Sequence, residues 1–262
     1  MSRFALTTII AAACITVLAL ALGGPARWWG MGAVAAAYLI IMVVGVTSIR
    51  LGFFCRAFCR GKPGQMRLAL TFDDGPDSDA TAPLLDVLKE QQVPAAFFCV
   101  GETAAANPGL VRRMAAEGHV VGNHTFRHGW WTNFLVGRPL RREVARAQEA
   151  LRGILGRAPR YFRSPVGLTN PHLRGALNSL DMVLLGWDVR PFDRGSRPEA
   201  VLRRIRRRVR DGSIIVLHDG GAHADTLSRL VTELVTELRA RGYTFASLEE
   251  LGAGPPYGKE PE

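Results

Sequence analysis

Two adjacent carboxylates and a spaced pair of histidines are the residues best suited to do chemistry. Asp73 and Asp74 follow the apolar run Met66–Phe72, where neighbouring carboxylates are costly to desolvate unless something positive binds them. His124 and His128 stand four residues apart, a spacing that would place both imidazoles on one face of a helix. Two histidines alone would as readily be structural. Together with a carboxylate they indicate a three-ligand metal site with room for water or substrate.

His218 is a further candidate for chemistry. It follows the buried-type apolar run 214–217, a place where a structural histidine is rarely needed. Because imidazole changes its charge near neutral pH, this side chain is a candidate general acid.

The elements that must position these groups alternate about seven times over 200 residues. The predicted strands are Met66–Phe72, Pro94–Val100, His119–Gly122, Arg160–Arg163, Met182–Asp188, Ser213–Leu217 and Tyr243–Ala246. The predicted helices are Ala80–Gln92, Asn107–Glu117, Leu140–Leu155, Pro171–Leu180, Arg197–Arg210 and Thr226–Arg241. This alternation predicts a parallel α/β fold, either a (β/α) barrel or an open doubly wound sheet.

The positions of the polar groups favour the barrel. Each of the following comes just after a predicted strand: Asp73-Asp74, His124 and His128, Arg163, Asp193, and His218. In a barrel such groups converge on the C-terminal rim. An open sheet would string them along one edge. We therefore expect a barrel with about seven parallel strands.

Four short segments occur in an order and at spacings typical of a known family. They are Thr71-Phe72-Asp73-Asp74-Gly75, His124-Thr-Phe-Arg-His128, Arg163-Ser-Pro-Val-Gly167 and Ile215-Val-Leu-His218-Asp219. Together they resemble the polysaccharide deacetylases of the NodB-homology type, carbohydrate esterase family 4, over roughly residues 66–250. The resemblance implies a distorted (β/α) barrel and hydrolysis of an N-acyl amide on an amino sugar.

The resemblance also implies a metal site and a base. One divalent ion, Zn²⁺ first and Co²⁺, Mn²⁺ or Ni²⁺ as alternatives, would be held by Asp74, His124 and His128. It would polarise the amide carbonyl and acidify its bound water. Asp73 would act as the general base, and Arg163 would hold it in place and ionised.

The remaining implied roles concern the leaving group and the oxyanion. His218 would protonate the departing amine, with Asp193 orienting it and raising its pKa. The backbone N–H of Val166 would help to stabilise the oxyanion. Leu217 is a further candidate for contact with the substrate.

One motif departs from the family pattern. Residues 187–194 align with a pattern that reads D-x-x-D-W, but Arg190 replaces the first acid and Arg194 replaces the tryptophan that lines the acyl pocket. Two guanidinium groups at the rim would suit an anionic substrate such as a sugar phosphate. They would equally suit solvated surface positions.

A strongly apolar region precedes the predicted domain. Residues 4–22 and 28–49 each reach the roughly 20 residues needed to cross about 30 Å of hydrocarbon. We expect residues 1–62 to be a membrane anchor of two transmembrane helices, residues 63–250 to be the deacetylase domain and residues 251–262 to be a flexible tail. A cleaved signal peptide followed by one span, or a buried helical hairpin, is the alternative.

The distribution of charge predicts a topology. The net charge is +10, and residues 1–62 contribute +6 of it because they contain six basic residues and no Asp or Glu. Two spans return the chain to the side where it began. The basic segment 50–62 then favours a domain on the cytoplasmic face of the cell (inner) membrane. A periplasmic or extracellular domain would require that only one run crosses and stays uncleaved.

Composition and motifs together narrow the function. With 48% hydrophobic residues the chain is not disordered, and four cysteines are too few for a disulfide scaffold. We expect a hydrolase of linear amides, a carbohydrate N-deacetylase, that removes acetyl or formyl from a polysaccharide or a polyprenyl-linked sugar.

A binding module is the alternative function. An inactive barrel would then serve as a membrane-anchored module for carbohydrate or anionic lipid, favoured by the arginine-rich helix 197–210. Nucleic acid is not an expected partner, because no aromatic stacking residues accompany these arginines.

Overall fold

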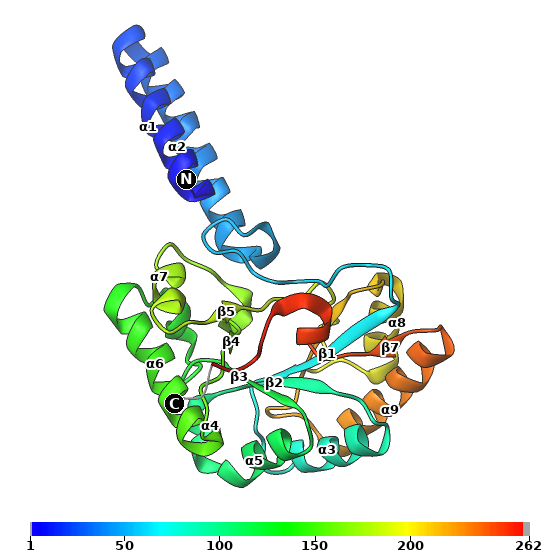
Figure 1. Cartoon of the computed structure of the whole chain (residues 1–262). Coiled ribbons are helices and arrows are strands. Elements are labelled where there is room, and N and C mark those ends of the chain that lie inside the picture. Colours follow the sequence, from blue (N-terminus) through cyan, green and yellow to red (C-terminus); the bar gives the residue numbers. More distant parts are fainter. Residues whose placement is uncertain (1, 259–262) are drawn as a thin grey trace.

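A computed structural model describes residues 2–258 of the chain (Figure 1). The α-helices are α1 (Arg3–Ala21), α2 (Gly24–Thr47), α3 (Thr81–Glu90), α4 (Gly101–Ala106), α5 (Pro108–Ala116), α6 (Gly137–Leu155), α7 (Leu173–Asn178), α8 (Pro198–Arg208) and α9 (Ala224–Ala240). The strands are β1 (Arg67–Asp73), β2 (Ala95–Cys99), β3 (Val120–Asn123), β4 (Tyr161–Phe162), β5 (Val183–Leu184), β6 (Ile214–His218) and β7 (Thr244–Phe245). Short helical turns η1 (Ile49–Leu51), η2 (Trp130–Phe134), η3 (Pro165–Gly167) and η4 (Glu249–Ala253) lie in the connections.

All strand pairs between these elements are parallel. The order is β5-β4-β3-β2-β1-β6, and β7 pairs with the first residues of β1. Beyond β5 the chain reaches β6 through a parallel bridge between Val189 and Ile215, which curls the sheet toward a half-barrel. The predicted distorted (β/α) barrel is therefore confirmed, in an incompletely closed form.

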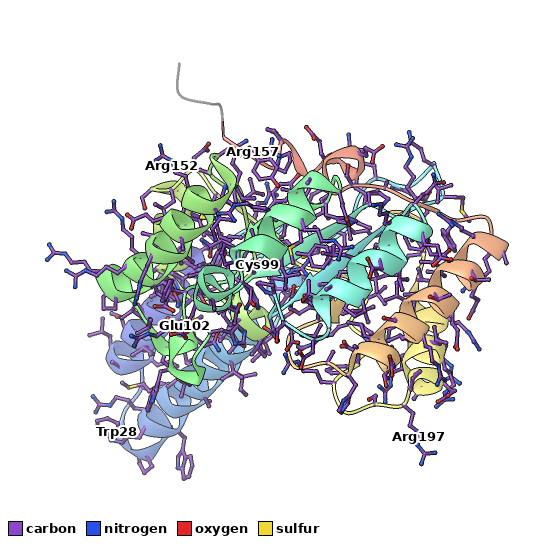
Figure 2. The ribbon with its side chains drawn as sticks, turned by 90° about the horizontal axis from the view of Figure 1, so that it is seen from below. Trp28, Cys99, Glu102, Arg152, Arg157 and Arg197 are labelled. Atoms are coloured by element: carbon purple, nitrogen blue, oxygen red, sulfur yellow. The ribbon has the colours of Figure 1, made fainter. Side chains whose placement is uncertain are left out.

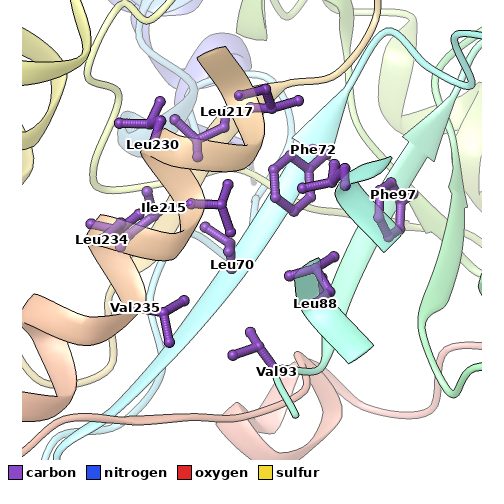
Figure 3. Packing of buried hydrophobic residues seen from close by; sticks show 14 of the residues in the cluster. Leu70, Phe72, Leu88, Val93, Phe97, Ile215, Leu217, Leu230, Leu234 and Val235 are labelled. Carbon is purple, nitrogen blue, oxygen red and sulfur yellow. The ribbon is translucent and has the colours of Figure 1, made fainter. Parts of the chain in front are cut away.

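Side-chain alternation along β1 and β6 separates the core from the site. On β1, Leu70 and Phe72 point to a large cluster beneath the outer helices, and Ile215 of β6 joins them (Figure 3). Each such fully buried apolar side chain contributes roughly 1.5–3 kcal/mol. The intervening residues of β1, Thr71 and Asp73, face the concave side of the sheet. The alternation of side chains along the strands therefore places polar groups on the concave side of the sheet, at the strand ends.

Helices α1 and α2 pack along each other and project from the domain (Figure 1). Their bounds differ by up to four residues from the predicted runs 4–22 and 28–49, because Pro25 begins α2 early. Each helix is long and apolar enough to cross a bilayer, and almost none of either is buried. A signal sequence has the same properties.

The chain beyond β7 returns along the domain. The Arg160 N–H donates to Pro256, the Gly258 N–H donates to Ala158, and the Tyr257 hydroxyl accepts the Val121 N–H at 3.1 Å. Residues 251–258 are therefore held, which differs from the expected flexible tail. The reason is that these backbone groups pair with chain ends distant in sequence. Residues 259–262 of that tail lie outside the described residues.

Candidate active site

A cavity of about 180 Å³ opens at the C-terminal ends of the parallel strands. It is lined by Asp73, Asp74, His124, His128, Val166, Trp187, Arg190, Arg194, Val216 and His218. Eight of these ten residues were predicted from the sequence. Two further predicted residues, Arg163 and Asp193, lie behind this lining and contact Asp73 and His218.

The two adjacent aspartates point in different directions. Asp73 is the last residue of β1, whereas Asp74 turns the chain with a φ of 74°, in the left-handed region. Its Oδ1 lies 3.2 Å from Nε2 of His124 and 3.1 Å from Nε2 of His128. Burial opposes its charge, but in their protonated form the two imidazoles hold the pKa of Asp74 well below its ordinary value. The carboxylate is therefore ionised, the form that binds a metal.

The donor set around Asp74 fits a cation. Nδ1 of His124 lies 2.8 Å from the carbonyl oxygen of Arg163, which can only accept, so this nitrogen carries the proton. In the neutral imidazole, the form that binds a metal, Nε2 presents a lone pair to Asp74 Oδ1, a buried oxygen that makes no hydrogen bond within residues 2–258. Lone pairs that face one another need a positive charge between them. One ligand atom from each of Asp74, His124 and His128 lies within 4.8 Å of the others, as a single metal ion requires.

The histidine pair is held by a loop, and the prediction of a helical face was wrong. Thr125 and His128 have positive φ values of 67° and 50°, which no α-helix accommodates. The side chain of Asn123, at the end of β3, accepts the Thr125 N–H at 2.9 Å and holds the loop. The imidazole rings still meet, with centroids 4.7 Å apart. The spacing of four residues therefore identified the correct pair of histidines, although the two residues lie in a loop and not on a helix.

Arg163 is completely buried and binds Asp73. Its Nη1 donates to Asp73 Oδ1 at 2.7 Å and to Thr71 Oγ1 at 2.8 Å, and its Nη2 donates to the Gly186 carbonyl at 3.0 Å. The guanidinium stacks 3.9 Å from the ring centre of Phe98. Burial lowers the pKa of Arg163, and the charge of Asp73 opposes this change. The pair fixes Asp73 at the cavity wall.

On the other side of the cavity, Asp193 holds His218 through two contacts. Asp193 Oδ1 lies 2.9 Å from Nδ1 of His218, and Oδ2 accepts the His218 backbone N–H at 2.8 Å. Burial alone would lower the pKa of His218, but the hydrogen bond and charge of Asp193 raise it above the ordinary value. His218 lines the cavity, and with Nδ1 held by Asp193 its Nε2 is the ring nitrogen available to donate a proton there.

Val166 and Arg190 lie at the mouth of the cavity. Val166 sits in η3 with a φ of 59°, and the turn uses the amides of Gly167 and Leu168 for its own hydrogen bonds. The guanidinium of Arg190 lies 5.4 Å from the ring centre of Trp187, a wall residue that sequence reasoning did not single out. The available signal was an indole near the end of the predicted strand 182–188, where the site residues of such a fold gather.

Leu217 does not reach the cavity, so its predicted contact with substrate was wrong. Its side chain is fully buried and packs toward Leu230 in the core (Figure 3). Alternation along β6 instead sends Val216 and His218 to the concave side.

Arg194 contacts the cluster of Asp74, His124 and His128 directly. Its Nη2 lies 2.6 Å from Asp74 Oδ2 and 2.7 Å from the Gly220 carbonyl. The side chain is 57% exposed, so it also faces solvent. The sequence predicted either a contact with an anionic substrate or a solvated surface position for Arg194. In the structure Arg194 is instead an ion-pair partner of Asp74 that is also partly exposed to solvent.

Asp219 is a buried carboxylate to which the sequence analysis assigned no role. It is fully buried, accepts a hydrogen bond of 2.6 Å from Thr81 and lies against Gly75, where a Cβ would come within 2.1 Å of Oδ2. Burial, together with the charges of Asp73 and Asp74, raises the pKa of Asp219 to about 7. Its position directly after His218 was the only sequence signal.

Comparison with known proteins gives one consistent result. Residues 60–185 match the family model described as polysaccharide deacetylase. A chitooligosaccharide deacetylase of Sinorhizobium fredii is 34% identical over 210 residues, which cover 75% of this chain and 97% of the relative. A peptidoglycan-N-acetylglucosamine deacetylase of Listeria monocytogenes is 34% identical over 186 residues, 71% of this chain. The chain spans only 38% of the length of that relative.

A solved structure agrees with these relatives. The chitin deacetylase from the fungus Colletotrichum lindemuthianum superposes with a TM-score of 0.70 at 29% identity, over 77% of this chain and 95% of that one. The range matched by the family model, residues 60–185, includes Asp73, Asp74, His124 and His128.

Proposed function

Because this chain belongs to the polysaccharide deacetylase family, we propose that it is a metal-dependent N-deacetylase of a carbohydrate. The observation that carries the proposal is the convergence of Asp74, His124 and His128 at one cavity that Asp73 and His218 also line. Relatives named for N-acetylglucosamine and chitooligosaccharide support an acetylated amino sugar as substrate.

The proposed reaction adds water across an amide, giving a free amine and a carboxylic acid. Asp74, His124 and His128 hold one divalent ion, proposed to be Zn²⁺, because two imidazoles and one carboxylate suit it. When bound, that ion supplies Lewis acidity toward the carbonyl oxygen and acidifies water.

The protein's own groups then move the protons. Asp73, held by Arg163, accepts a proton from the attacking water. His218, held by Asp193, donates a proton to the amine nitrogen as the carbon–nitrogen bond breaks. The Val166 N–H donates to the developing oxyanion.

We propose that the helical hairpin anchors this domain in the cell membrane and that the domain faces the cytoplasm. The basic segment 50–62, directly after the second apolar run, supports this orientation. A membrane anchor also favours a polyprenyl-linked sugar over a free polymer as the substrate, and the guanidinium of Arg190 suits its phosphate. A reporter enzyme fused to the C-terminus, active on one side of the membrane only, tests the orientation.

The activity is tested on the full chain purified in detergent. Metal content and acetate release are measured with chitooligosaccharides and, separately, with an N-acetylated polyprenyl-phosphate sugar. Wild type should contain one metal ion per chain and release acetate, whereas Asp73→Asn and His218→Ala should not. Asp225→Asn, an exposed acid in the first turn of α9 that does not line the cavity, is the matched control. A fully active His218→Ala enzyme would refute the mechanism, and stoichiometric metal without release from either substrate would refute the substrate class.

A further inference from the structure

A group of large apolar side chains is exposed between the histidine loop and α6. Trp131 is 61% exposed, Phe134 is 68% exposed and Val136 is 51% exposed. The rings of Trp131 and Phe134 meet edge to face, with centroids 5.9 Å apart. Exposed apolar groups gathered in one segment mark a surface that contacts something other than water. We call residues 131–136 the apolar rim.

Hydrogen bonds connect this rim to the base of the helical hairpin. The Leu135 carbonyl accepts a hydrogen bond of 3.1 Å from the Asn170 side chain. The neighbouring Thr169 donates its N–H to Val46 at 3.0 Å and its hydroxyl to Gly45 at 3.2 Å. Val46 and Gly45 belong to the last turn of α2. The apolar rim therefore lies beside the end of α2 that joins the domain.

The length of α2 places that end at a membrane surface. Trp28 and Trp29, at the far end, are 69% and 80% exposed and suit the interfacial belt. From Trp29 to Val46 the helix rises about 26 Å at about 1.5 Å per residue. That rise is close to the roughly 30 Å of hydrocarbon in a bilayer. With the tryptophans in one interface, Val46 and the apolar rim lie at the other.

Charge next to the rim indicates the chemistry of the partner. Arg138, Arg141 and Arg142 are exposed on the first two turns of α6, and no acidic residue stands in its first turn. Within residues 2–258 no carboxylate pairs with these three arginines. Cations at a helix N-terminus oppose the helix dipole, so a negative partner is needed to offset them.

A hollow of about 390 Å³ next to these arginines is wide enough to admit a phosphate headgroup. Arg138, Arg141 and His172 line it, together with Pro171, which follows the Thr169–Asn170 link to the hairpin. The apolar rim, the arginines and the hollow thus form one surface at the level of the hairpin base.

We propose that the apolar rim docks into the headgroup–acyl boundary of an anionic bilayer, with Arg138, Arg141 and Arg142 binding lipid phosphates. Tryptophan and phenylalanine partition to that boundary, and nearby arginines are attracted to anionic headgroups. His128 stands three residues before Trp131, so docking sets the cavity mouth against the membrane surface. The inference rests on the proposed membrane anchor. It adds that the domain has its own lipid-binding surface and a defined orientation.

Site-specific fluorescent labels on the full chain in liposomes test this docking. An environment-sensitive label is placed at Phe134→Cys or at Arg152→Cys, each in a Cys14→Ser background. Phe134 lies just before α6. Arg152 lies near the C-terminal end of that helix, roughly 22 Å along it from its start. In Figure 2 the Arg152 edge lies opposite the hairpin tip at Trp28. Cys55 and Cys99 are buried, and the unsubstituted background corrects for labelling of Cys59.

Lipids carrying a shallow spin label should quench the label at position 134 several-fold more than at 152. The difference should be larger with phosphatidylglycerol than with phosphatidylcholine alone. Replacing Arg138, Arg141 and Arg142 by glutamine should remove this lipid dependence. A variant with Arg112→Gln and Arg229→Gln, two exposed arginines elsewhere, should keep it.

A third label, on native Cys14 in the middle of α1, separates the inference from the anchor. Quenching of Cys14 by a deep spin label with no excess at position 134 would overturn the docking surface and leave the anchor intact. No quenching of Cys14 would overturn the anchor and the docking surface together. Quenching at 134 that ignores anionic lipid would overturn the role given to the arginines.

Discussion

Replacing Asp193 by asparagine tests whether His218 is the proton donor. In the structure, Asp193 Oδ1 lies 2.9 Å from Nδ1 of His218 and Oδ2 accepts the His218 N–H at 2.8 Å. Asparagine keeps one oxygen for the backbone N–H and turns an NH₂ group toward Nδ1. The variant therefore keeps the shape of the site but loses the charge that pairs with an imidazolium.

The size of the effect follows from the bond that is lost. A hydrogen bond to a charged group is worth about 1.5–3 kcal/mol. Since about 1.4 kcal/mol is a factor of ten in rate, kcat should fall about 10- to 150-fold.

The pH dependence of kcat provides a second test, because the direction in which it should shift can be predicted. Asp193 raises the pKa of His218, and a proton donor works only while it is protonated. Activity is therefore present below this pKa and is lost as pH rises through it. Removing the charge lowers the pKa, so the alkaline limb of kcat should move to lower pH in the variant.

The assay is acetate release against pH by the detergent-solubilised full chain, with equal metal content in each sample. Asp225→Asn, an exposed acid in the first turn of α9, is the matched control and should behave as wild type. An unchanged kcat and an unmoved alkaline limb in Asp193→Asn would refute the assignment of His218.

Three further perturbations follow from the same geometry. Arg163→Met leaves Asp73 buried without its partner, so urea denaturation should show a loss of about 3–5 kcal/mol, and an unchanged stability would contradict the pairing. His128→Ala removes a proposed ligand and should weaken Zn²⁺ binding, in competition with a chromophoric chelator, by at least the roughly 10–100-fold typical of outer-shell changes. Binding as tight as wild type would exclude this residue as a ligand. In metal-free protein the pKa of Asp219 is about 7 when folded against an ordinary 3.8, so wild-type stability falls as pH rises between these values. Asp219→Asn lacks this dependence and should gain up to about 4 kcal/mol over wild type by pH 8, and parallel pH curves for the two proteins in urea would refute it.

Local patterns in the sequence were sufficient for the order of elements. The alternating run before Asp73 and the apolar runs at 94–100 and 213–217 became β1, β2 and β6, because their periodicity reports burial directly. The segments predicted at 160–163, 182–188 and 243–246 form strands of only two residues. Their length depends on neighbouring strands at the sheet edge, which a local window does not contain.

The same local patterns identified most of the chemistry but only part of its placement. Adjacent aspartates at a strand end and histidines four apart signalled the cluster around Asp74. Alternation along β6 would also have predicted that Val216 faces the cavity and that Leu217 faces the core. The expected contact of Leu217 with substrate is excluded by the strand period of two.

The sequence by itself determined the types of reactive groups, the strands that end in them and the apolar hairpin that precedes them, because composition and periodicity are local properties. Tertiary structure alone decided that Asp74 meets histidines 50 residues away, that Arg163 is buried against Asp73, and that Arg194 reaches Asp74. It also decided that the chain after β7 folds back on the domain and that the apolar rim lies beside α2. These contacts join segments far apart in the chain, and they exist only once parallel strands are brought into register by burial of the helices that connect them.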